Sequence, residues 1–400
     1  MARAGALALA FAACIAGGCT SLGERIAQPH SSGFIDAGTL GQMESVIGLG
    51  SARYLTPDDV TLSYGTIAPA TRGMEYTISR SDGSRELAIR VDRETGRVPA
   101  KGSVVYLHGW GLDASSMLPW ALALSELGYR GVTVDLRNHG RSSRAPAGFG
   151  TREAGDIAAL VEHLQADGRL PPPIYLFGVS YGGATALFAE PLLRERITGV
   201  VVMETYANAG DGVRGVIAGM QARRADDGMR TRLMRAYTRW RYDAQDIERG
   251  VREAGRRLDL DLDTIDVRTV LATTATCTLL LHGARDRYIP IDVGRSLADA
   301  SALVHYRELP DENHVSLPLR IEWLARPLDA WLQEVADGKC GPLQLPADPL
   351  ADGGPSRFAV DDEVDPATRP NAEQAAHSPS GDAPAPSPPT DATHEHAIPR

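Results

Sequence analysis

The sequence lacks the residue clusters that metal sites and phosphate sites require. Its four cysteines and ten histidines form no paired set of the kind that zinc needs, so no metal is expected. Its glycines flank a serine and do not form a phosphate-cradling loop. We therefore expect no cofactor.

The sequence also lacks the basic charge that nucleic-acid binding needs. The formal net charge is −10, of which residues 341–400 carry −7, so the rest of the chain is close to neutral. A near-neutral body gives no argument for a nucleic-acid partner. With 43% hydrophobic and 23% charged residues, the composition is typical of a globular protein with a sizeable core.

The N-terminal apolar run is too short to cross a membrane, because a spanning helix needs about 20 residues. A single Arg3 precedes this run, and residues 1–18 are predicted to be a secretory signal peptide. Three small residues immediately before Cys19 resemble a bacterial lipoprotein processing site. That resemblance implies lipidation of Cys19 and attachment to a membrane. The alternative is an ordinary cleaved signal and a periplasmic or secreted protein, so export is expected either way.

The chain divides into a lead-in, a folded domain and a tail. Residues 19–72 have no strong hydrophobic period and are expected to form a tether and an irregular lead-in. The last 60 residues contain 12 of the 26 prolines, and such a composition buries too little apolar surface to offset the entropy of ordering. Residues 341–400 are therefore predicted to be disordered, which leaves 73–340 as the folded domain.

Strand-like and helix-like runs alternate through the folded domain. It opens with a predicted hairpin in which Asp82-Gly83 separates two alternating runs. Strands are then predicted at 102–107, 131–135, 173–178, 198–204, 277–281 and 304–309. Helices are predicted at 114–127, 152–165, 184–193, 293–300 and 316–336. This alternation predicts an α/β fold with a mostly parallel central sheet flanked by helices.

The alternation is interrupted between residues 206 and 274 by an insertion that contains only helix-like stretches. One of these, 229–242, has apolar residues at helical spacing. They are Leu233, Met234, Tyr237 and Trp240. We expect most of this stripe to pack on the core, with a pocket lining as the alternative. The many arginines favour a solvated face over contact with anionic head groups or acidic substrates.

The stretch 174–183 places a serine between an apolar strand and a helix-forming run. Its pattern Gly178-Val-Ser180-Tyr-Gly182 is typical of a nucleophile elbow, a sharp strand-to-helix turn. A serine there takes a strained backbone conformation, which occurs mainly at functional sites. The glycines remove side chains that would collide where strand and helix cross. The helix N-terminus beside the serine favours developing negative charge.

Five motifs together resemble those of the α/β-hydrolase superfamily. They are His108-Gly-Trp-Gly111, Asp135-Leu-Arg-Asn-His-Gly-Arg-Ser142, Gly178-Val-Ser-Tyr-Gly182, His282-Gly-Ala-Arg-Asp286 and Asp311-Glu-Asn-His314. Each motif is common alone, but all five occur in the expected order between about residues 74 and 336. The resemblance implies an α/β-hydrolase fold, with the insertion at about 206–274 as a helical cap over the site.

The resemblance also implies a catalytic triad. Ser180 is the expected nucleophile, and a serine hydroxyl needs a base to take its proton. His314, in a loop after a strand and before the final helix, is expected to be that base. Asp286 lies just past a strand end, fits the chain order Ser, acid, His, and is expected to orient the histidine. Glu204 is the alternative acid.

An oxyanion needs two preorganised hydrogen-bond donors. By resemblance, these are the backbone N–H groups of Trp110 and Tyr181. Gly109 and Gly111 allow the first loop to bring its amide close to the substrate oxygen. Two interpretations of the Trp110 and Tyr181 side chains stay open, since they either wall an acyl pocket or only pack.

Other polar residues at strand ends are interpreted as structural. Asp135, Arg137 and His139 lie in a loop that is generally a scaffold in this superfamily, and its polar groups tie the turn to its neighbours. His108 and His282 receive the same interpretation.

The fold that the resemblance implies places Cys277 at the start of a strand and Cys340 after a helix that runs antiparallel to it. Both cysteines are then expected at the end of the sheet opposite the site. An exported compartment permits disulfides. We therefore expect that these two residues can pair.

These expectations combine into one function, that of an exported and lipid-anchored serine hydrolase acting on ester bonds without a cofactor. The expected partners are a small-molecule or lipid-like ester and a membrane. Peptidases and acyltransferases share the same catalytic residues, and the sequence does not separate them. A binding protein that keeps the fold without catalysis is a further alternative, disfavoured because Ser180, Asp286 and His314 are all intact.

Overall fold

The computed structural model describes residues 20–29, 33, 35, 37–81, 84–223, 229–351 and 355–359. The predicted signal peptide at 1–18, the predicted lipidation site Cys19 and most of the tail lie outside these residues. Within them, no helix combines the length and the apolar character that a membrane crossing would require.

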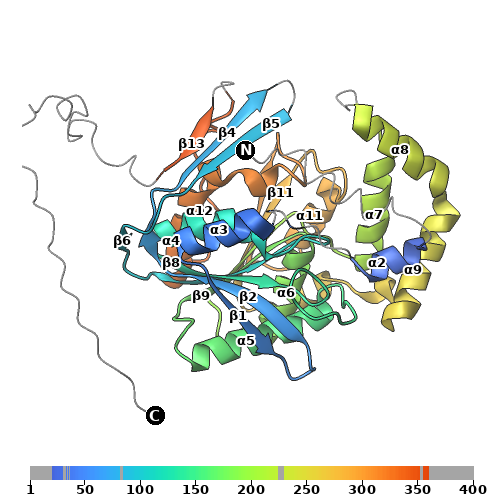
Figure 1. Ribbon diagram of the computed structural model, residues 1–400. Coiled ribbons are helices and arrows are strands. Elements are labelled where there is room, and N and C mark those ends of the chain that lie inside the picture. The colour runs from blue at the N-terminus through green and yellow to red at the C-terminus, as the bar shows by residue number, and fades with distance from the viewer. Residues whose placement is uncertain are drawn as a thin grey trace, which may run out of the picture. The chain divides into compact units, whose positions relative to one another are not determined.

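The central sheet has eight strands in the order β1-β2-β8-β7-β9-β10-β11-β12 (Figure 1). The six strands from β8 to β12 pair in parallel, while β2 pairs antiparallel with both β1 and β8. The strands are β1 (Gly50–Leu55), β2 (Thr61–Ile67), β7 (Gly102–Leu107), β8 (Tyr129–Asp135), β9 (Ile174–Val179), β10 (Gly199–Met203), β11 (Cys277–Gly283) and β12 (Val304–Leu309). The predicted mostly parallel sheet is confirmed.

Helices cover both faces of this sheet and enclose two hydrophobic clusters. One cluster includes the apolar sides of α5 (Thr151–Ala166) and α6 (Tyr181–Leu193), and the other includes those of α4 (Leu118–Glu126) and α12 (Ile321–Ala336). Every residue of β7, β9, β10 and β11 is buried. That explains why these strands are continuous apolar runs without alternation. The short η1 (Ala114–Met117) and α11 (Ile291–Ala298) complete the flanking layers.

The predicted irregular lead-in over residues 19–72 is wrong for much of its length. This segment forms α2 (Leu22–Ala27), α3 (Ala37–Ile47), β1, β2 and β3 (Ala70–Thr71). Strand β2 is buried at five of its seven positions, including four consecutive ones. A strand enclosed on both faces has no period of two for the sequence to reveal, so its place in the sheet was not predicted.

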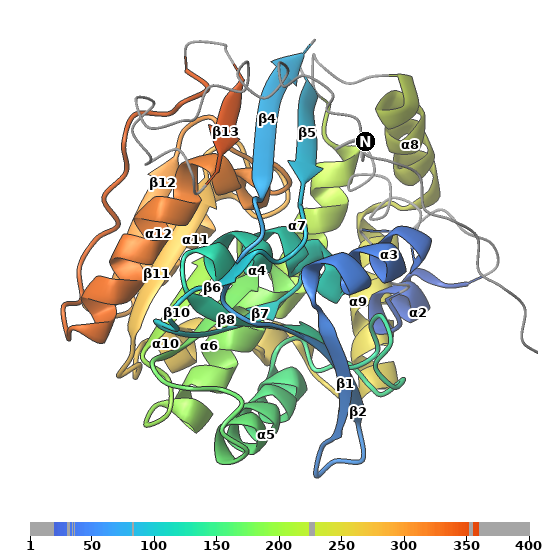
Figure 2. The same cartoon turned by 60° about the vertical axis from the view of Figure 1, so that its left-hand side comes forward.

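The predicted hairpin is present as β4 (Glu75–Ser81) and β5 (Ser84–Arg90), and it is extended by a strand from the tail. Strand β13 (Ser356–Phe358) pairs antiparallel with β4, and the three strands lie side by side in Figures 1 and 2. The hairpin prediction is therefore confirmed. Separately, β3 pairs with the short strand β6 (Gly96–Arg97).

The predicted disorder of residues 341–400 is wrong for the described part of that segment. Leu343, Leu350 and Phe358 are buried in the second cluster, and Asp348 pairs with Arg320 of the lead-in to α12. A composition rich in proline hid these few apolar anchors. Residues 360–400 lie outside the described part of the chain.

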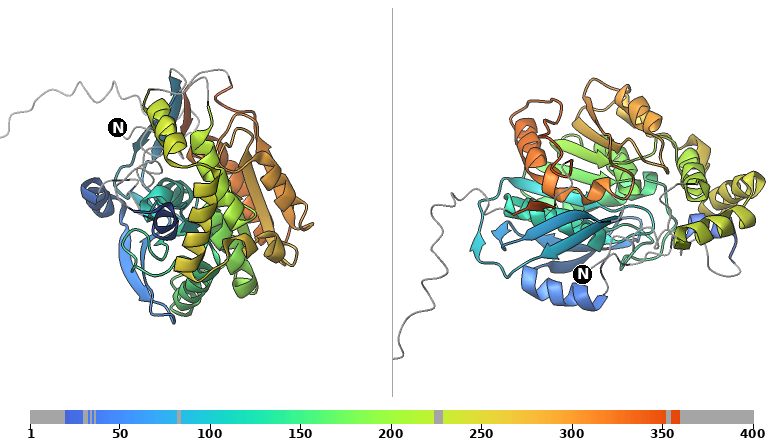
Figure 3. Two further views of the ribbon diagram at one scale, coloured as in Figure 1. Left: turned by 90° about the vertical axis from the view of Figure 1, so that its right-hand side faces the viewer. Right: turned by 90° about the horizontal axis from the view of Figure 1, so that it is seen from above.

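The insertion between 206 and 274 is helical, as predicted. It contains α7 (Ala209–Gln221), α8 (Met229–Arg241), α9 (Ala244–Leu258), η2 (Leu262–Thr264) and α10 (Arg268–Leu271). The N-terminal helix α2 joins this group, because Ser21 Oγ donates to Glu253 at 2.7 Å and Leu22 lies against Gly250 of α9. Figures 1 and 3 show α7, α8, α9 and α2 gathered at one edge of the fold. We call these four helices the cap.

A disulfide joins Cys277 and Cys340. Cys277 opens β11, and Cys340 follows the end of α12. Because Ser180 follows β9 at its carboxyl end and β9 runs parallel to β11 through β10, the disulfide lies at the opposite end of the sheet from Ser180. It ties the last helix to the sheet.

Candidate active site

Ser180 occupies a sharp turn between β9 and α6. Its backbone angles are φ 53° and ψ −112°, a region that non-glycine residues rarely occupy. A Cβ on Gly178 would lie 2.1 Å from the Gly182 carbonyl oxygen, and a Cβ on Gly182 would lie 2.1 Å from that of Leu107. Both contacts are impossibly close, so these two glycines let the strand and the helix meet at this angle.

The structure brings Ser180, His314 and Asp286 into one hydrogen-bonded chain. His314 Nε2 lies 3.0 Å from Ser180 Oγ, and His314 Nδ1 lies 2.7 Å from Asp286 Oδ2. The histidine and the aspartate come from the loops after β12 and β11. Parallel strands end at the same edge of a sheet, which is why side chains 134 residues apart in the sequence converge here.

Asp286 is held as a buried carboxylate. Its Oδ1 accepts hydrogen bonds from the backbone N–H groups of Tyr288 at 2.7 Å and Ile289 at 2.9 Å. Burial alone would raise the pKa of Asp286. The charge of His314 and a hydrogen bond from Glu204 outweigh that effect and lower the pKa well below its ordinary value. The aspartate is therefore ionised at the point where it faces His314.

Glu204, the alternative acid, lies in the same site with a different charge. It is buried at the end of β10 with φ 59°, and its Oε1 accepts from the Gly283 N–H at 3.0 Å. Its Oε2 is 3.7 Å from His314 Nδ1. Burial, and then the hydrogen bond with Asp286 and its negative charge, raise the pKa of Glu204 well above its ordinary value. The opposite directions of the two pKa shifts favour the proton on Glu204 over Asp286.

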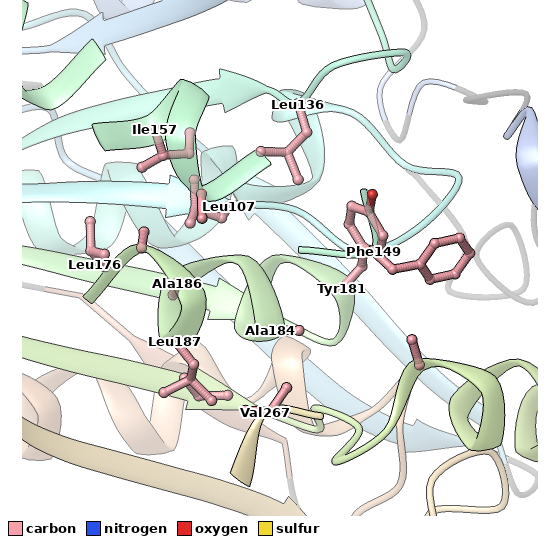
Figure 4. Packing of buried hydrophobic residues seen from close by; sticks show 14 of the residues in the cluster. Leu107, Leu136, Phe149, Ile157, Leu176, Tyr181, Ala184, Ala186, Leu187 and Val267 are labelled. Atoms are coloured by element: carbon pink, nitrogen blue, oxygen red, sulfur yellow. The ribbon is translucent and has the colours of Figure 1, made fainter. Parts of the chain in front are cut away.

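The two residues of the expected oxyanion donors lie close to Ser180, because Tyr181 follows it in the chain and Trp110 lines the same cavities. Tyr181 is the first residue of α6, so its N–H has no acceptor within the helix. Trp110 lies in the loop after β7, where Gly111 takes φ 70°. The rings of Trp110 and Tyr181 meet edge to face with centroids 4.9 Å apart, and Phe149 stacks on Trp110 at 5.0 Å. Figure 4 shows Phe149 beside Tyr181 at the start of α6.

Two apolar cavities meet at Ser180 and Trp110. The first is lined by residues of the elbow, of α7 and of the N-terminal helix, namely Leu22, Arg25, Ile26, Trp110, Gly111, Phe149, Ser180, Tyr181, Tyr206, Ala209, Gly212, Val213, Val216, Ile217 and Ile289. The second lies on the histidine side and includes Met117, Trp120, Tyr288, His314, Val315 and Leu319. The side chains of Trp110 and Tyr181 therefore line a cavity as well as pack.

Sequence reasoning did not find α2 among the residues of the site. Leu22 and Ile26 close the first cavity from the side of the cap, although the segment that carries them was expected to be a tether. The feature of the sequence that could have indicated this helix is the spacing of four residues between Leu22 and Ile26, which places both on one face of a helix.

Three of the polar residues interpreted as structural, Asp135, Arg137 and His139, make contacts that support this interpretation. Asp135 accepts hydrogen bonds from the backbone N–H groups of Ala114 and Arg141 at 2.8 and 2.9 Å. Arg137 forms a bidentate ion pair with Asp156. Burial and the neighbouring His108 lower the pKa of His139 to about 3. This histidine is thus uncharged and packs under Trp110.

Within the described residues, two sets of three metal-ligating side chains come within 4.8 Å of one another. One is Cys277, His305 and Cys340, whose sulfur atoms are already joined in the disulfide. The other is Glu204, Asp286 and His314, where the histidine nitrogen and the aspartate are already hydrogen-bonded. Both sets have partners within the protein.

The sequence matches the model of the alpha/beta hydrolase family over residues 104–331. It is 28% identical over 215 residues to the AB hydrolase superfamily protein YisY of Bacillus subtilis, covering 48% of this chain and 78% of that relative. It is also 37% identical over 110 residues to the human protein phosphatase methylesterase 1. That match covers 25% of this chain and spans 28% of the methylesterase.

The fold is similar to that of solved esterases. Esterase Pf2001 of Pyrococcus furiosus superimposes with a TM-score of 0.52 and 17% identity, covering 78% of this chain and 99% of that chain. A second crystal form of the same esterase gives a TM-score of 0.51 with 16% identity, covering 79% and 100%. At this level of identity, the similarity concerns the fold.

Proposed function

Because the chain belongs to the alpha/beta hydrolase family, we propose that it is a serine hydrolase that cleaves carboxylic ester bonds. Ser180 is the nucleophile, His314 the general base and Asp286 the acid that orients the histidine. The observation that carries this proposal is the continuous chain of hydrogen bonds from Asp286 through His314 to Ser180. That arrangement activates a hydroxyl for attack on an acyl carbon.

The reaction proceeds in two halves. Ser180 Oγ attacks the ester carbonyl carbon as His314 Nε2 takes the hydroxyl proton, and the carbon–oxygen bond to the alcohol then breaks. His314 gives its proton to the departing oxygen, so an alcohol leaves and an acyl-enzyme remains. Water, deprotonated by the same nitrogen, attacks the acyl carbon, and the bond from that carbon to Ser180 Oγ breaks. His314 returns the proton to Oγ, so the acid leaves and the serine hydroxyl is restored. Asp286 stabilises the imidazolium that forms in each half.

The negative charge of each tetrahedral intermediate falls between the two expected N–H donors, those of Trp110 and Tyr181. A backbone amide at the start of a helix is a fixed donor that needs no rearrangement during the reaction. Removing one such donor typically costs ~10²–10³ in rate. Because backbone amides cannot be removed by substitution, the nucleophile offers the sharper test.

The cavities support an ester that is apolar on both sides of its carbonyl group. His314 lines the second cavity, and the leaving oxygen must reach this histidine, so the alcohol part belongs there. The acyl part then occupies the first cavity, against Phe149 and Val213. The names of the relatives, an esterase and a methylesterase, are consistent with ester hydrolysis.

The proposal is tested by labelling with a fluorophosphonate probe. The wild type is expected to be labelled and Ser180→Ala is not. Ser116→Ala serves as the matched control, because Ser116 lines the second cavity but donates to the Asp113 carbonyl oxygen. Labelling that survives in Ser180→Ala would refute the assignment. Labelling without release of acid from p-nitrophenyl esters, but with cleavage of peptides or transfer to an acceptor alcohol, would favour a peptidase or an acyltransferase.

We also propose that the protein is exported and carries a lipid on Cys19. The support is the resemblance of residues 1–19 to a bacterial lipoprotein signal. Mass spectrometry of the mature N-terminus tests this directly. A lipidated Cys19 is expected, whereas an unmodified first residue at another position would contradict the proposal.

A further inference from the structure

Helix α8, from Met229 to Arg241, has an unusual composition. Its 13 residues include five arginines and no acidic residue. The same helix carries large apolar side chains, and most of the set Leu233, Met234, Tyr237 and Trp240 was predicted to pack on the core. The structure contradicts that prediction for Leu233 and Trp240, which are exposed.

Three large apolar side chains of α8 form an exposed stripe that points away from the protein. The exposed fractions are 73% for Met229, 64% for Leu233 and 80% for Trp240. At about 100° per residue, these three positions fall within an arc of about 40° on the helix. The buried Thr238 lies on roughly the opposite side. The helix therefore packs through a polar residue and presents its apolar stripe outward.

Arginines flank this stripe on both sides. By the same helical geometry, Arg232 and Arg239 lie along one edge and Arg241 along the other, and all three are exposed. A cationic helix with leucine, methionine and tryptophan on one face is the pattern of a helix that lies in a membrane interface. Its arginines then reach the head groups while its apolar side chains enter the acyl boundary.

The site described above does not account for this stripe. Neither cavity at Ser180 is lined by a residue of α8. Elsewhere in the described chain, the large exposed apolar side chains are Leu55 on β1 and Leu192 on α6, which stand alone on their elements. Single exposed apolar residues are ordinary, whereas a contiguous apolar patch marks a binding surface.

We propose that α8 is a docking surface for an anionic lipid bilayer. The charge of the helix selects this occupant, because each arginine near an anionic surface adds favourable electrostatic energy, and no acidic residue of α8 opposes it. The inference goes beyond the proposed function and does not depend on it. It also does not depend on the lipid at Cys19. Ser21, near the start of the described chain, is hydrogen-bonded to Glu253 of α9, and α9 begins three residues after α8 ends.

Vesicle flotation tests the proposal with the full chain carrying Cys19→Ser, so that no lipid is attached. The vesicles contain phosphatidylcholine alone or phosphatidylcholine with phosphatidylglycerol. The background protein is expected to bind the anionic vesicles more tightly. Leu233→Glu with Trp240→Glu should weaken that binding by about tenfold or more, and Arg239→Glu with Arg241→Glu should do the same. The arginine contribution should decline as salt is added.

Leu192→Glu is the matched control, because it places the same charge on an exposed leucine of α6 and should leave vesicle binding unchanged. Thermal unfolding of every variant should match that of the background protein, which shows that a loss of binding is not a loss of fold. Equal binding by the α8 variants and the background protein would overturn the proposal. Binding without preference for anionic vesicles would also overturn it. So would a dimer in light scattering that Leu233→Glu dissociates, because a second copy would then cover the stripe.

Discussion

Glu204 and Asp286 are two buried carboxyl groups that face one histidine. Two negative charges that share a buried site repel each other strongly. A proton on one of the two carboxyl groups removes this repulsion. Asp286 has two backbone N–H donors and the imidazole, whereas Glu204 has the single donor from Gly283. This difference and the raised pKa of Glu204 favour the proton on Glu204, whose Oε2 makes no hydrogen bond outside this pair among the described residues. We therefore predict that Glu204 is a positioning residue that acts through Asp286.

Substitution of Glu204 distinguishes a protonated positioning residue from a second ionised acid. Glu204→Gln keeps an uncharged side chain with a donor, so kcat should fall by less than about tenfold. Glu204→Leu removes the donor and leaves the Gly283 N–H unpaired in the interior, and kcat should fall further with little change in KM. Asp286→Asn should be far more damaging, by up to about 10⁴-fold. Steady-state kinetics on one soluble ester measures all three. If Glu204→Gln lost as much activity as Asp286→Asn, Glu204 would be the ionised acid.

At the scale of residues, the motifs predicted side chains that the structure brings together, and they favoured Asp286 over Glu204 as the acid. The elbow was predictable because only glycine fits at Gly178 and Gly182, a constraint that is visible in the residue types. The preference for Asp286 over Glu204 rested on chain order, because both residues follow strands that end at the same sheet edge. Their distances from His314 are set by loop conformations that no local pattern encodes.

The N-terminal helix α2 and helix α7 form the outer wall of the first cavity. Leu22 and Ile26 of α2 and Val213 and Val216 of α7 all line this cavity. A helix of six residues is too short to be stable alone, and its position depends on packing against α9. Because the wall is apolar and comes from two separate segments, its side chains determine how long an acyl chain the cavity admits.

Ile26→Ala should therefore shift the substrate preference towards longer acyl chains. Removing three methyl or methylene carbons opens space in which a longer ester gains about 0.8 kcal/mol for each buried CH₂. We expect the ratio of kcat/KM for longer to shorter p-nitrophenyl esters to rise several-fold. Glu24→Ala on the same helix does not alter the cavity lining and should keep the wild-type profile. A uniform loss across all chain lengths would show that α2 supports the fold without setting specificity.

At the scale of elements, the spacing of apolar residues predicted the helices and the central strands. It did not predict whether the apolar face of an element points to the core or to the outside. The stripe on α8 has a clear helical spacing, and spacing shows that residues share a face without showing where that face points. Strand β2 had no visible period because it is enclosed on both sides. Both errors have one cause, since burial is set by neighbours that are distant in the sequence.

Arg320 connects the last helix, a strand-end loop and the tail. It is fully buried and pairs with Glu312, Glu322 and Asp348. Three carboxyl groups around one guanidinium leave an excess of negative charge, which a proton can relieve. Burial raises the pKa of Glu322 from 4.5 to about 7, even though the charge of Arg320 opposes this shift.

The raised pKa of Glu322 predicts a pH dependence of stability. The folded state holds this proton up to about pH 7, whereas the unfolded state releases it near pH 4.5. Folding is therefore favoured by this group at low pH, and its contribution is lost as the pH rises from about 4.5 to about 7, by on the order of 3 kcal/mol. Glu322→Gln cannot titrate, so the stability of the wild type relative to this variant should decline over that window. Urea unfolding at a series of pH values measures the difference, and a flat difference would contradict the prediction.

The part of the tail that the structure describes is integral to the folded domain. Trp331 Nε1 donates to the Gly341 carbonyl oxygen at 2.8 Å, and Trp323 Nε1 donates to that of Pro346 at 3.1 Å. Beyond these contacts, β13 adds a strand to the hairpin, and Leu343 and Leu350 fill the cluster on the α12 face. The described residues among 341–359 therefore complete the core, although they lie outside the predicted folded domain at 73–340.

Truncation tests this role of the tail at the scale of the whole molecule. A chain that ends after Cys340 keeps the disulfide but loses three buried apolar side chains, each worth about 2 kcal/mol, together with the Asp348 partner of Arg320. Its Tm should fall by more than about 10 °C. A chain that ends after residue 360 keeps all of these contacts and should unfold at the wild-type temperature, because the composition of 361–400 predicts disorder. If both truncations unfolded at the same temperature as the full chain, the packing of residues 341–359 would contribute nothing to stability. If the Tm of both truncated chains fell by the same amount, the effect would instead be assigned to the residues after 360.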